Sequence, residues 1–490
     1  MTNNYGNVGR DATLRRPRPR RAGGIVGVAP LNASRTAQRA VPTSRWLVNG
    51  IIPKNNHFIA VTAALALTFV LTACRSVDTK AGVNGSGAFA TGHYRNLFAE
   101  DGHSPQEIQS KIDSAFEQLF HGDPATQAVF YYAGTNANGP LACVTDIKHH
   151  DVRTEGLSYG MMIAVQMNKK SEFDAIWNWS KTYLYHDSPT DPSYDFFSWQ
   201  AKTNGETMSE FVAPDGESYY VMALYFAADR WGNGTGIYNY KAEADRLLTN
   251  MRHRQPITGQ LFMLRRNSDT HTNFTVTAGP LFDAKHIMVL FSPSTERGAF
   301  TDPSYHLPAF YELWARWGPP ADSNFWMAAA AASRDFLPHA ANPVTGLTPD
   351  YANFDGTVIS NRWNQGAVNF RFDAFRTAGN WSVDWSWWGK DVRERELSDR
   401  LQAFFESKGM DSYGCQFTLD GRQLDDRHAQ GLVAVNADAS LAATNPRSRK
   451  FVEALWNTPT PDGIERYYEG LLYMMALLHC SGEFRIWSPQ

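Results

Sequence analysis

The sequence predicts an all-α fold over residues 93–490, in which helical hairpins form a barrel. Patterns of helical periodicity follow one another along this region, whereas clear alternating strand patterns are scarce. The loops between the helical patterns are rich in Gly, Pro, Asp and Asn. The helix expected at 467–479 is apolar almost all round, which favours burial. About a dozen helices joined by long loops are what a barrel of helical hairpins requires.

The first helix of this region is predicted after Ser104. Ser104 and Glu107 have the spacing of a capping box, and Pro105 takes the first helical position. Further helices are predicted at 171–185, 216–230, 304–317, 323–336, 389–407, 431–443, 447–457 and 464–479. The segment 253–300 fits this pattern least well. It has two short strand patterns, near 271–277 and 286–291, and is interpreted as an elaborated surface loop or hairpin.

The first 92 residues have a different composition. Residues 1–50 are basic and lack apolar periodicity, which predicts a disordered segment. A nucleic-acid-binding arm, an over-called start site and an extended leader remain open for this segment. Residues 51–74 contain an apolar run that suits a signal peptide, and Leu71-Thr72-Ala73-Cys74 resembles the lipobox of bacterial lipoproteins. We therefore expect export and a membrane anchor at Cys74, with an ordinary secretory signal as the alternative, and a flexible tether at 75–92.

The overall composition excludes some partners. The formal net charge of −3 gives no global reason to expect nucleic acid. Three cysteines follow Cys74 without CxxC spacing, so neither a disulfide framework nor a zinc site is predicted. The 15 Trp, 20 Tyr and 29 Phe could bind sugar rings or simply fill a large core.

Glu155 is the strongest candidate for a catalytic group. It lies in Arg153-Thr154-Glu155-Gly156-Leu157-Ser158-Tyr159-Gly160, directly before an apolar stretch. An apolar environment disfavours the charged carboxylate and raises its pKa. A carboxylic acid that stays protonated near neutral pH can protonate the leaving oxygen of a glycoside. The alternative is a glutamate that only stabilises the start of a helix.

Four more acidic residues stand among small and aromatic neighbours: Asp215, Asp302, Asp350 and Asp373. Asp215 and Asp302 could equally be helix caps, and Asp350 a turn residue. Asp373 differs because Arg371 and Arg376 are close in sequence, and guanidinium groups should depress its pKa and keep it ionised. A neutral Glu155 and a charged Asp373 would be the pair that glycoside hydrolysis needs.

The order of motifs over residues 93–490 is similar to that of glycoside hydrolase family eight, and within it to the reducing-end xylose-releasing exo-oligoxylanases. The matching segments include 94–98, 151–161, 214–217, 302–313, 373–376 and the end motif Tyr467-Tyr468-Glu469-Gly470-Leu471-Leu472-Tyr473. The resemblance implies an (α/α)₆ barrel, inversion at the anomeric carbon, and no metal or cofactor. It implies that Glu155 is the general acid, Asp373 the general base, Asp215 a carboxylate that holds a distorted sugar, and Tyr305 a neighbour of the attacking water.

The exo-acting members close the leaving-group side of the groove beyond one xylose. His428 is the best match for the blocking histidine, Arg153 could assist there, and Arg376 completes the substrate-binding candidates. Trp199 is placed to stack on a sugar.

Three alternatives stay open. They are an endo-acting xylanase, cellulase or chitosanase of the same family, a non-catalytic oligosaccharide-binding lipoprotein, and a sugar epimerase that uses His149-His150.

Overall fold

The computed structural model describes residues 86–264, 270–295 and 298–489. All of them lie within the second of two compact units, Val77–Gln490. The predictions of a basic disordered segment at 1–50, a signal peptide at 51–74 and lipidation at Cys74 lie outside the described residues. Within those residues, no helix combines the length and the apolar character that a membrane crossing requires.

The predicted tether extends too far along the chain. Ala88–Thr91 form a short helix, α1, in which Ala88 is buried and the Phe89 ring stacks on Trp388 at 4.4 Å. An added Cβ on Gly87 would stand 2.2 Å from the carbonyl carbon of Trp387, so only glycine permits this close approach. Residues 87–91 therefore belong to the folded body, because they pack against it.

The described residues are mainly helical, as predicted. The principal helices are α2 (Leu97–Glu100), α3 (Pro105–Phe116), α4 (Thr154–Gln166), α5 (Lys170–Tyr183), α6 (Pro214–Trp231), α7 (Tyr240–His253), α8 (Pro308–Trp317), α9 (Ser323–Ala340), α10 (Phe372–Trp388), α11 (Arg393–Lys408), α12 (Gln430–Asp438), α13 (Ser448–Asn457) and α14 (Arg466–Ser481). The capping box at Ser104 and Glu107 is present at the start of α3. Helices α2, α7 and α10 lie outside the predicted ranges, whereas α4 covers the apolar stretch after Glu155.

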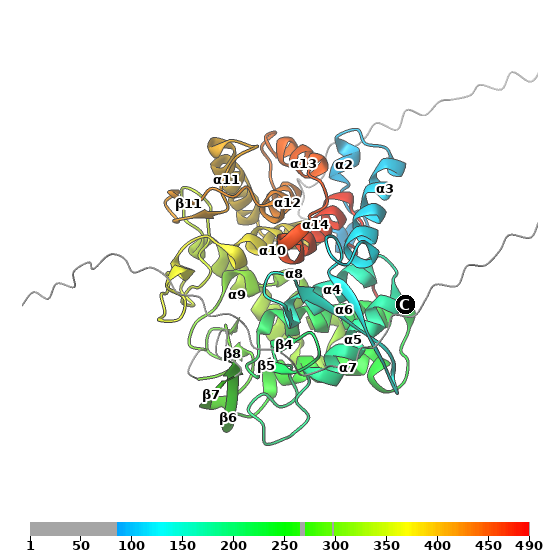
Figure 1. Cartoon of the computed structure of the whole chain (residues 1–490). Coiled ribbons are helices and arrows are strands. Elements are labelled where there is room, and N and C mark those ends of the chain that lie inside the picture. The colour runs from blue at the N-terminus through cyan, green and yellow to red at the C-terminus, as the bar shows by residue number, and fades with distance from the viewer. Residues whose placement is uncertain (1–85, 265–269, 296–297, 490) are drawn as a thin grey trace, which may run out of the picture. The chain divides into compact units, whose positions relative to one another are not determined.

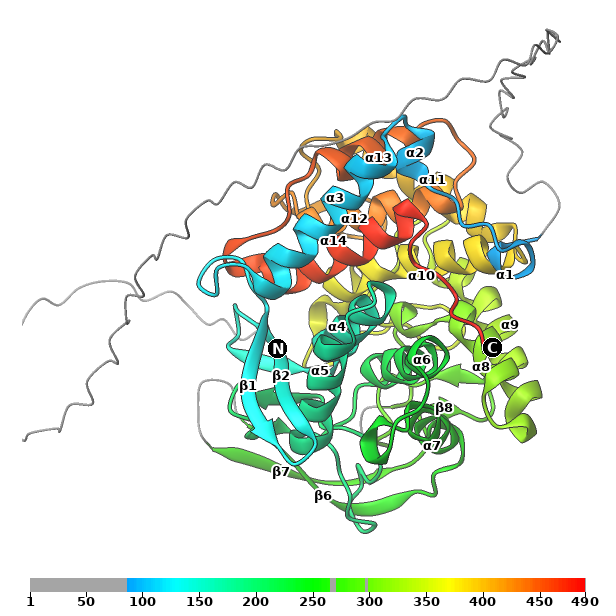
Figure 2. The same cartoon turned by 90° about the vertical axis from the view of Figure 1, so that its right-hand side faces the viewer.

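Six helices of this set are almost wholly buried and contact one another in chain order. Helix α4 contacts α6, and the contacts continue through α8, α10, α12 and α14, which in turn contacts α4. Each of them also packs against a more polar helix: α5, α7, α9, α11 and α13 follow their partners in the chain, whereas α3 contacts α14 (Figures 1 and 2). The prediction that the helix at 467–479 is buried is confirmed.

The prediction of an all-α fold is wrong in one respect, because strands are also present. Seven consecutive antiparallel strands form one sheet: β1 (Phe130–Asn136), β2 (Gly139–Asp146), β3 (Asp151–Arg153), β4 (Gln200–Lys202), β5 (Thr207–Ser209), β6 (Ile257–Leu264) and β7 (His271–Ala278). Two-stranded pairs are β8 (Phe282–Asp283) with β9 (Met288–Val289), and β10 (Gln416–Phe417) with β11 (Gln423–Asp425). The long β6–β7 hairpin accounts for much of the predicted irregular segment 253–300 (Figure 2).

The sheet positions one part of the site directly. Strand β3 ends at Arg153, whose extended backbone is the cap of α4, so strand and helix join without a loop. The backbone N–H of Thr154 donates to the carbonyl of Trp199 at 3.0 Å. The sheet therefore holds Arg153, Trp199 and the start of α4 together.

Candidate active site

Three acidic side chains occupy the same position in three of the six buried helices. Glu155, Asp215 and Asp373 are each the second residue of α4, α6 and α10. The residue before each helix is extended, which turns the chain sharply into the helix. The positive end of a helix dipole favours a carboxylate at this position. The fold thus brings these three sequence-predicted residues to one place.

Arg376, one turn into α10, joins the three carboxylates. Its Nη1 lies 2.8 Å from Asp215 Oδ2 and 3.3 Å from Glu155 Oε2, and its Nη2 lies 3.0 Å from Asp373 Oδ1. Hydrogen bonds from the same guanidinium reach the hydroxyls of Tyr159 and Ser304, both at 3.1 Å. Only 3% of the Arg376 side chain is exposed, so this cation is a fixed, desolvated centre.

Glu155 has the environment of a protonated acid. Burial raises the pKa of its carboxyl to about 7, and the carboxylates of Asp215 and Asp373 add to the shift while Arg376 opposes it. The expected raised pKa is therefore confirmed. Its Oε1 accepts a hydrogen bond of 3.1 Å from the hydroxyl of Tyr467. With 15% of the side chain exposed, the carboxyl can still reach a bound molecule.

Asp373 differs from the expectation in one property. Burial raises the pKa of its carboxyl, although Arg376, Arg153 and Arg371 oppose the shift, so the predicted depression of its pKa is wrong. The arginines are near as expected, but the Asp215 carboxylate and the loss of water outweigh them. A third of the Asp373 side chain is exposed, which leaves it the most accessible of the three carboxylates.

Asp302 and Asp350 form a second layer of carboxyl groups. Burial raises the pKa of both carboxyl groups well above the usual range. The nearby Asp373 carboxylate raises the pKa of each further. Asp302 caps the short 3₁₀ turn Pro303–Tyr305, which confirms the cap interpretation, but its second oxygen has no partner among the described residues. Tyr305, at the end of that turn, lies 5.8 Å from the Arg376 guanidinium. Tyr305 is thus adjacent to the carboxylate cluster.

Arg153 and Trp199 lie on the sheet side of Glu155. The Arg153 guanidinium pairs with Asp151 and Asp146, each at 3.0 Å, and lies 5.8 Å from the centre of the Trp199 ring. Trp199 is only partly buried, against the small apolar cluster of Phe211, Leu261 and Val276. A partly exposed indole fixed by an arginine is suited to stacking on a sugar ring.

His428 is held by a different set of contacts. Its Nδ1 lies 2.8 Å from the carbonyl of Tyr413, and its ring meets the Tyr413 ring edge-on at 4.5 Å. These contacts fix the imidazole, but they join it to Tyr413, which follows α11, and not to Glu155 or Asp373. The structure therefore does not bring His428 into direct contact with the carboxylate cluster.

The sequence did not single out Tyr467, which donates a hydrogen bond to Glu155, as a site residue. This tyrosine is the second residue of α14, the same position that the three acids occupy in their helices. That shared position is visible only from the observed helix starts, because the predicted ranges begin at 216 and 464 and omit α10.

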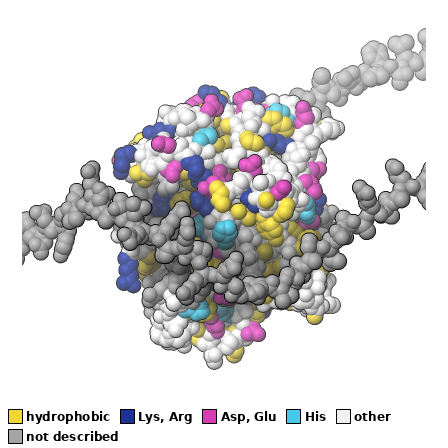
Figure 3. All heavy atoms as spheres, in the orientation of Figure 1, with side chains coloured by type: hydrophobic (Ala, Val, Ile, Leu, Met, Phe, Trp, Pro, Cys, Tyr) yellow, Lys and Arg dark blue, Asp and Glu magenta, His cyan; other side chains and the backbone are white. Residues whose placement is uncertain are grey.

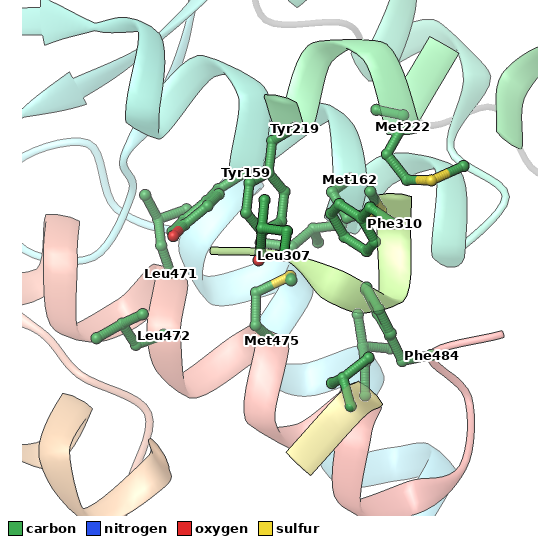
Figure 4. Close-up of a cluster of buried hydrophobic side chains, with 14 of the residues drawn as sticks. Tyr159, Met162, Tyr219, Met222, Leu307, Phe310, Leu471, Leu472, Met475 and Phe484 are labelled. Carbon is green, nitrogen blue, oxygen red and sulfur yellow. The ribbon is translucent and has the colours of Figure 1, made fainter. Parts of the chain in front are cut away.

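A cavity of about 30 Å³ lies next to Arg376. Side chains from all six buried helices line it, including Tyr159, Tyr219, Phe310, Arg376, Val435 and Met475. Figure 4 shows several of these side chains pointing toward one another. Two buried nitrogens, Arg376 Nε and His479 Nε2, have no hydrogen-bond partner among the described residues. The volume has room for about two water molecules.

Within the described ranges, no cluster of three His, Cys, Asp or Glu side chains has the arrangement of a metal site. The surface facing the viewer in Figure 3 carries both acidic and basic side chains, scattered among uncharged ones. What the cluster at Arg376 offers is acid–base chemistry on a molecule that reaches Glu155 and Asp373.

Comparisons with known proteins agree with this chemistry. Residues 137–282 and 291–482 match the family described as Glycosyl hydrolases family 8. The reducing-end xylose-releasing exo-oligoxylanase Rex8A of Paenibacillus barcinonensis is 40% identical over 408 residues, which cover 83% of this chain and 100% of that protein.

Two solved structures from Teredinibacter turnerae are also similar. One is a family 8 xylobiose complex, and the other is a xylohexaose complex of a catalytic mutant xylanase. Each is 53% identical to this chain with a TM-score of 0.78, and covers 82% of this chain and 100% of its own.

Proposed function

Because the chain belongs to glycosyl hydrolase family 8, we propose that it is an inverting hydrolase that releases xylose from the reducing end of β-1,4-xylo-oligosaccharides. The observation that carries the proposal is the cluster at Arg376, where a protonated Glu155 and the accessible Asp373 share one buried cation. The relative Rex8A supports the choice of substrate by its name and its full-length similarity.

Glu155 is the general acid of this reaction. A pKa of about 7 keeps a large fraction of the carboxyl protonated at neutral pH. When the glycosidic bond breaks, Glu155 gives its proton to the departing oxygen, and the resulting carboxylate is stabilised by the nearby Arg376. Mechanistically, the leaving xylose departs as a neutral alcohol.

Asp373 is the general base that removes a proton from the attacking water. Burial raises the pKa values of Asp302 and Asp350 well above the usual range, which favours their neutral forms beside it. The negative charge of this side of the site then stays on Asp373, next to Arg376. Tyr305 is proposed to hold the water, and Asp215 to hold the sugar at the cleavage point in a distorted form.

The remaining candidates bind the chain of sugars. Trp199 stacks on a xylose ring, and Arg153 and His428 contact the reducing-end sugar on the leaving-group side. The limit to one xylose depends on that side, since a closed groove releases monomers whereas an open groove releases mixed oligomers.

The test is product analysis with xylotriose and with xylotriose reduced at its end to the alditol. We expect xylose and xylobiose from xylotriose and little cleavage of the reduced sugar, because a site built around a hydroxyl rejects an altered partner strongly. Equal cleavage of both substrates would contradict the exo-acting proposal while leaving the hydrolase intact.

An endo-acting xylanase is the second candidate, and a specific observation favours it. The two Teredinibacter turnerae structures are more similar to this chain in sequence than Rex8A is, and one is called a xylanase with bound xylohexaose. Early products from xylohexaose separate the candidates. Xylose with xylopentaose supports the exo-oligoxylanase, whereas xylotriose and xylobiose support the xylanase.

We also propose that the six buried helices close into an (α/α)₆ barrel. The contact of α14 with α4 and the cavity lined by all six helices support closure.

Export with a lipid anchor at Cys74 remains a proposal that rests on the sequence alone. Metabolic labelling with a fatty acid, compared between the natural chain and Cys74→Ala, tests it. Equal labelling of both proteins would contradict an anchor at this cysteine.

A further inference from the structure

The segment Tyr467-Tyr468-Glu469, at the start of α14, contacts three separate parts of the proposed site. Tyr467 donates to Glu155, and the Tyr468 hydroxyl donates to the carbonyl of Phe372 at 2.6 Å. Glu469 binds the loop that carries His428. We propose that this segment is a positioning element, in which Tyr467 orients the acid and Glu469 fixes the loop on the leaving-group side. The proposal rests on the proposed function.

Tyr467 is fixed against the acid's own helix. Its ring lies so close to Gly156 that an added Cβ would stand 2.4 Å from a ring carbon and 2.6 Å from the hydroxyl oxygen. The side chain is 2% exposed, and burial raises the pKa of the phenol well above its usual range. The Tyr467 phenol therefore remains a hydrogen-bond donor near neutral pH.

The two oxygens of Glu155 consequently have different partners. Oε1 accepts from Tyr467, and Oε2 faces Arg376 at 3.3 Å. A hydrogen bond to an ionised acceptor is stronger than one to a neutral acceptor, so Tyr467 stabilises the carboxylate and limits the rise of the Glu155 pKa. The other titratable groups that face Glu155 are Arg153, Tyr159, Asp215, Asp373 and Tyr468.

Glu469 holds the loop on both sides of His428. Its Oε1 pairs with the guanidinium of Arg427, and its Oε2 accepts from the backbone N–H of Gln430 at 2.7 Å. Gly431 packs so closely on α14 that an added Cβ would lie 3.0 Å from Glu469 Cα. Only 5% of Glu469 is exposed, so a buried carboxylate from α14 fixes the start of α12 and the histidine before it.

The first experiment tests Tyr467. In Tyr467→Phe we expect the alkaline limb of the pH profile of kcat/KM to move to higher pH by about one unit, because the lost bond stabilised the ionised acid. Tyr473→Phe is the matched control. It removes a similar hydroxyl from the same helix, one that donates to the carbonyl of Thr458 at 2.9 Å, and should leave the limb in place.

An unchanged limb in Tyr467→Phe, or a shift to lower pH, would overturn the role of Tyr467. Thermal melting of both variants shows whether the comparison is made between folded proteins. If the natural enzyme releases no xylose, the proposed function is refuted. The role of Tyr467 is still tested in that case, because the pH limb can be followed with any substrate that the enzyme cleaves.

The second experiment tests Glu469. We expect Glu469→Gln and His428→Ala each to raise KM for xylotriose several-fold, and the double variant to be little worse than either single variant, because one residue acts through the other. Arg427→Gln breaks the same pair from its more exposed partner and should give the same result if Glu469→Gln folds poorly. Glu465→Gln, which removes a surface pair with Lys148, is the control.

Additive effects in this cycle, or no effect of His428→Ala on KM, would overturn the role of Glu469. The pH limb distinguishes the two arms of the segment, since Glu469→Gln should leave it unchanged. If the natural enzyme cleaves internally, the exo-acting function fails, yet the coupling between Glu469 and His428 is still measured.

Discussion

At the scale of single residues, one buried cation serves three carboxylates. Arg376 faces Glu155, Asp215 and Asp373 together, and burial raises the pKa of the Glu155 carboxyl to about 7. The proposed role of Glu155 as the acid rests on this raised pKa.

Replacement of the acid gives the first prediction. Glu155→Ala should lower turnover of xylo-oligosaccharides by about 10²–10⁴-fold, the usual contribution of a positioned proton donor. The far-ultraviolet circular dichroism should stay unchanged, because the side chain contacts Tyr467 and Arg376 but is not part of the apolar core. Turnover above half of the natural value would remove Glu155 from the role of acid.

The pH dependence gives the second prediction. Glu155 must be protonated to act, so kcat/KM should fall as pH rises above about 7. Asp373 must be ionised to act, and its raised pKa moves the acidic limb upward, which narrows the active range from below. Initial rates between pH 4 and 9 check both limbs. Activity that stays constant through the alkaline range would contradict the assignment of Glu155.

The stereochemical outcome gives the third prediction. If a water is held between the substrate and Asp373, the two carboxyl groups should stand about 6.5–9.5 Å apart and the product should be inverted. Proton NMR of the first product from a β-linked substrate should therefore show the α anomer. Initial appearance of the β anomer would exclude Asp373 as the base.

At the scale of elements, the site depends on how closely helix starts approach one another. An added Cβ on Gly216, near the start of α6, would stand 2.5 Å from Thr154 Oγ1 and 2.6 Å from Thr154 Cβ at the start of α4. The second residues of these helices, Asp215 and Glu155, are thereby held near a common arginine.

Gly216→Ala gives the fourth prediction. The forced separation of α4 and α6 should lower the free energy of unfolding by about 1–3 kcal/mol. It should also lower kcat, because it moves Glu155 away from Asp215. Chemical denaturation and initial rates measure the two effects. Gly379→Ala in α10 is the control, since its added Cβ would come no closer than 3.3 Å. An equal loss in both variants would contradict the close-packing argument.

Several elements were predictable because their sequence signal is plain, although α7, which buries residues at helical spacing, was missed. Helix α14 is apolar all round, and α3 has a capping box, so both were predictable. Helix α10 was missed because tryptophans and a mid-helix glycine interrupt its pattern. Strands β3, β4 and β5 have three residues each, too few for alternation to be recognised.

The residues at the centre of the candidate site were predictable from the sequence, but the direction of the Asp373 pKa shift was not. Glu155, Asp215, Asp373 and Arg376 were all named from the sequence, and the structure brings them together. The pKa of Asp373 was predicted in the wrong direction, because sequence neighbours reveal nearby arginines but not burial or the approach of Asp215 from another helix. The contact between Tyr467 and Glu155 was not predictable either, because it joins distant parts of the chain.

At the scale of the whole molecule, the proposed ring of helices places residues from both ends of the described chain side by side. The Tyr94 hydroxyl accepts a hydrogen bond from the backbone N–H of Ile486 at 2.9 Å, and Gln166 binds the backbone of Arg485. Figure 2 shows α1 near the C-terminal residues. Stability is therefore a property of the whole ring, because each buried helix needs neighbours on both sides.

The contact between α14 and α4 has a consequence for the order of synthesis. Glu155 and Tyr467 are 312 positions apart in the chain, so a ribosome that adds about 5–20 residues per second needs about 15–60 s to travel between them. During that interval α4 has been synthesised but α14, which covers it, has not. Glu155 therefore lacks its hydrogen bond from Tyr467. A nascent chain stalled before Arg466 should therefore be inactive, and activity should begin only after α14 has been released.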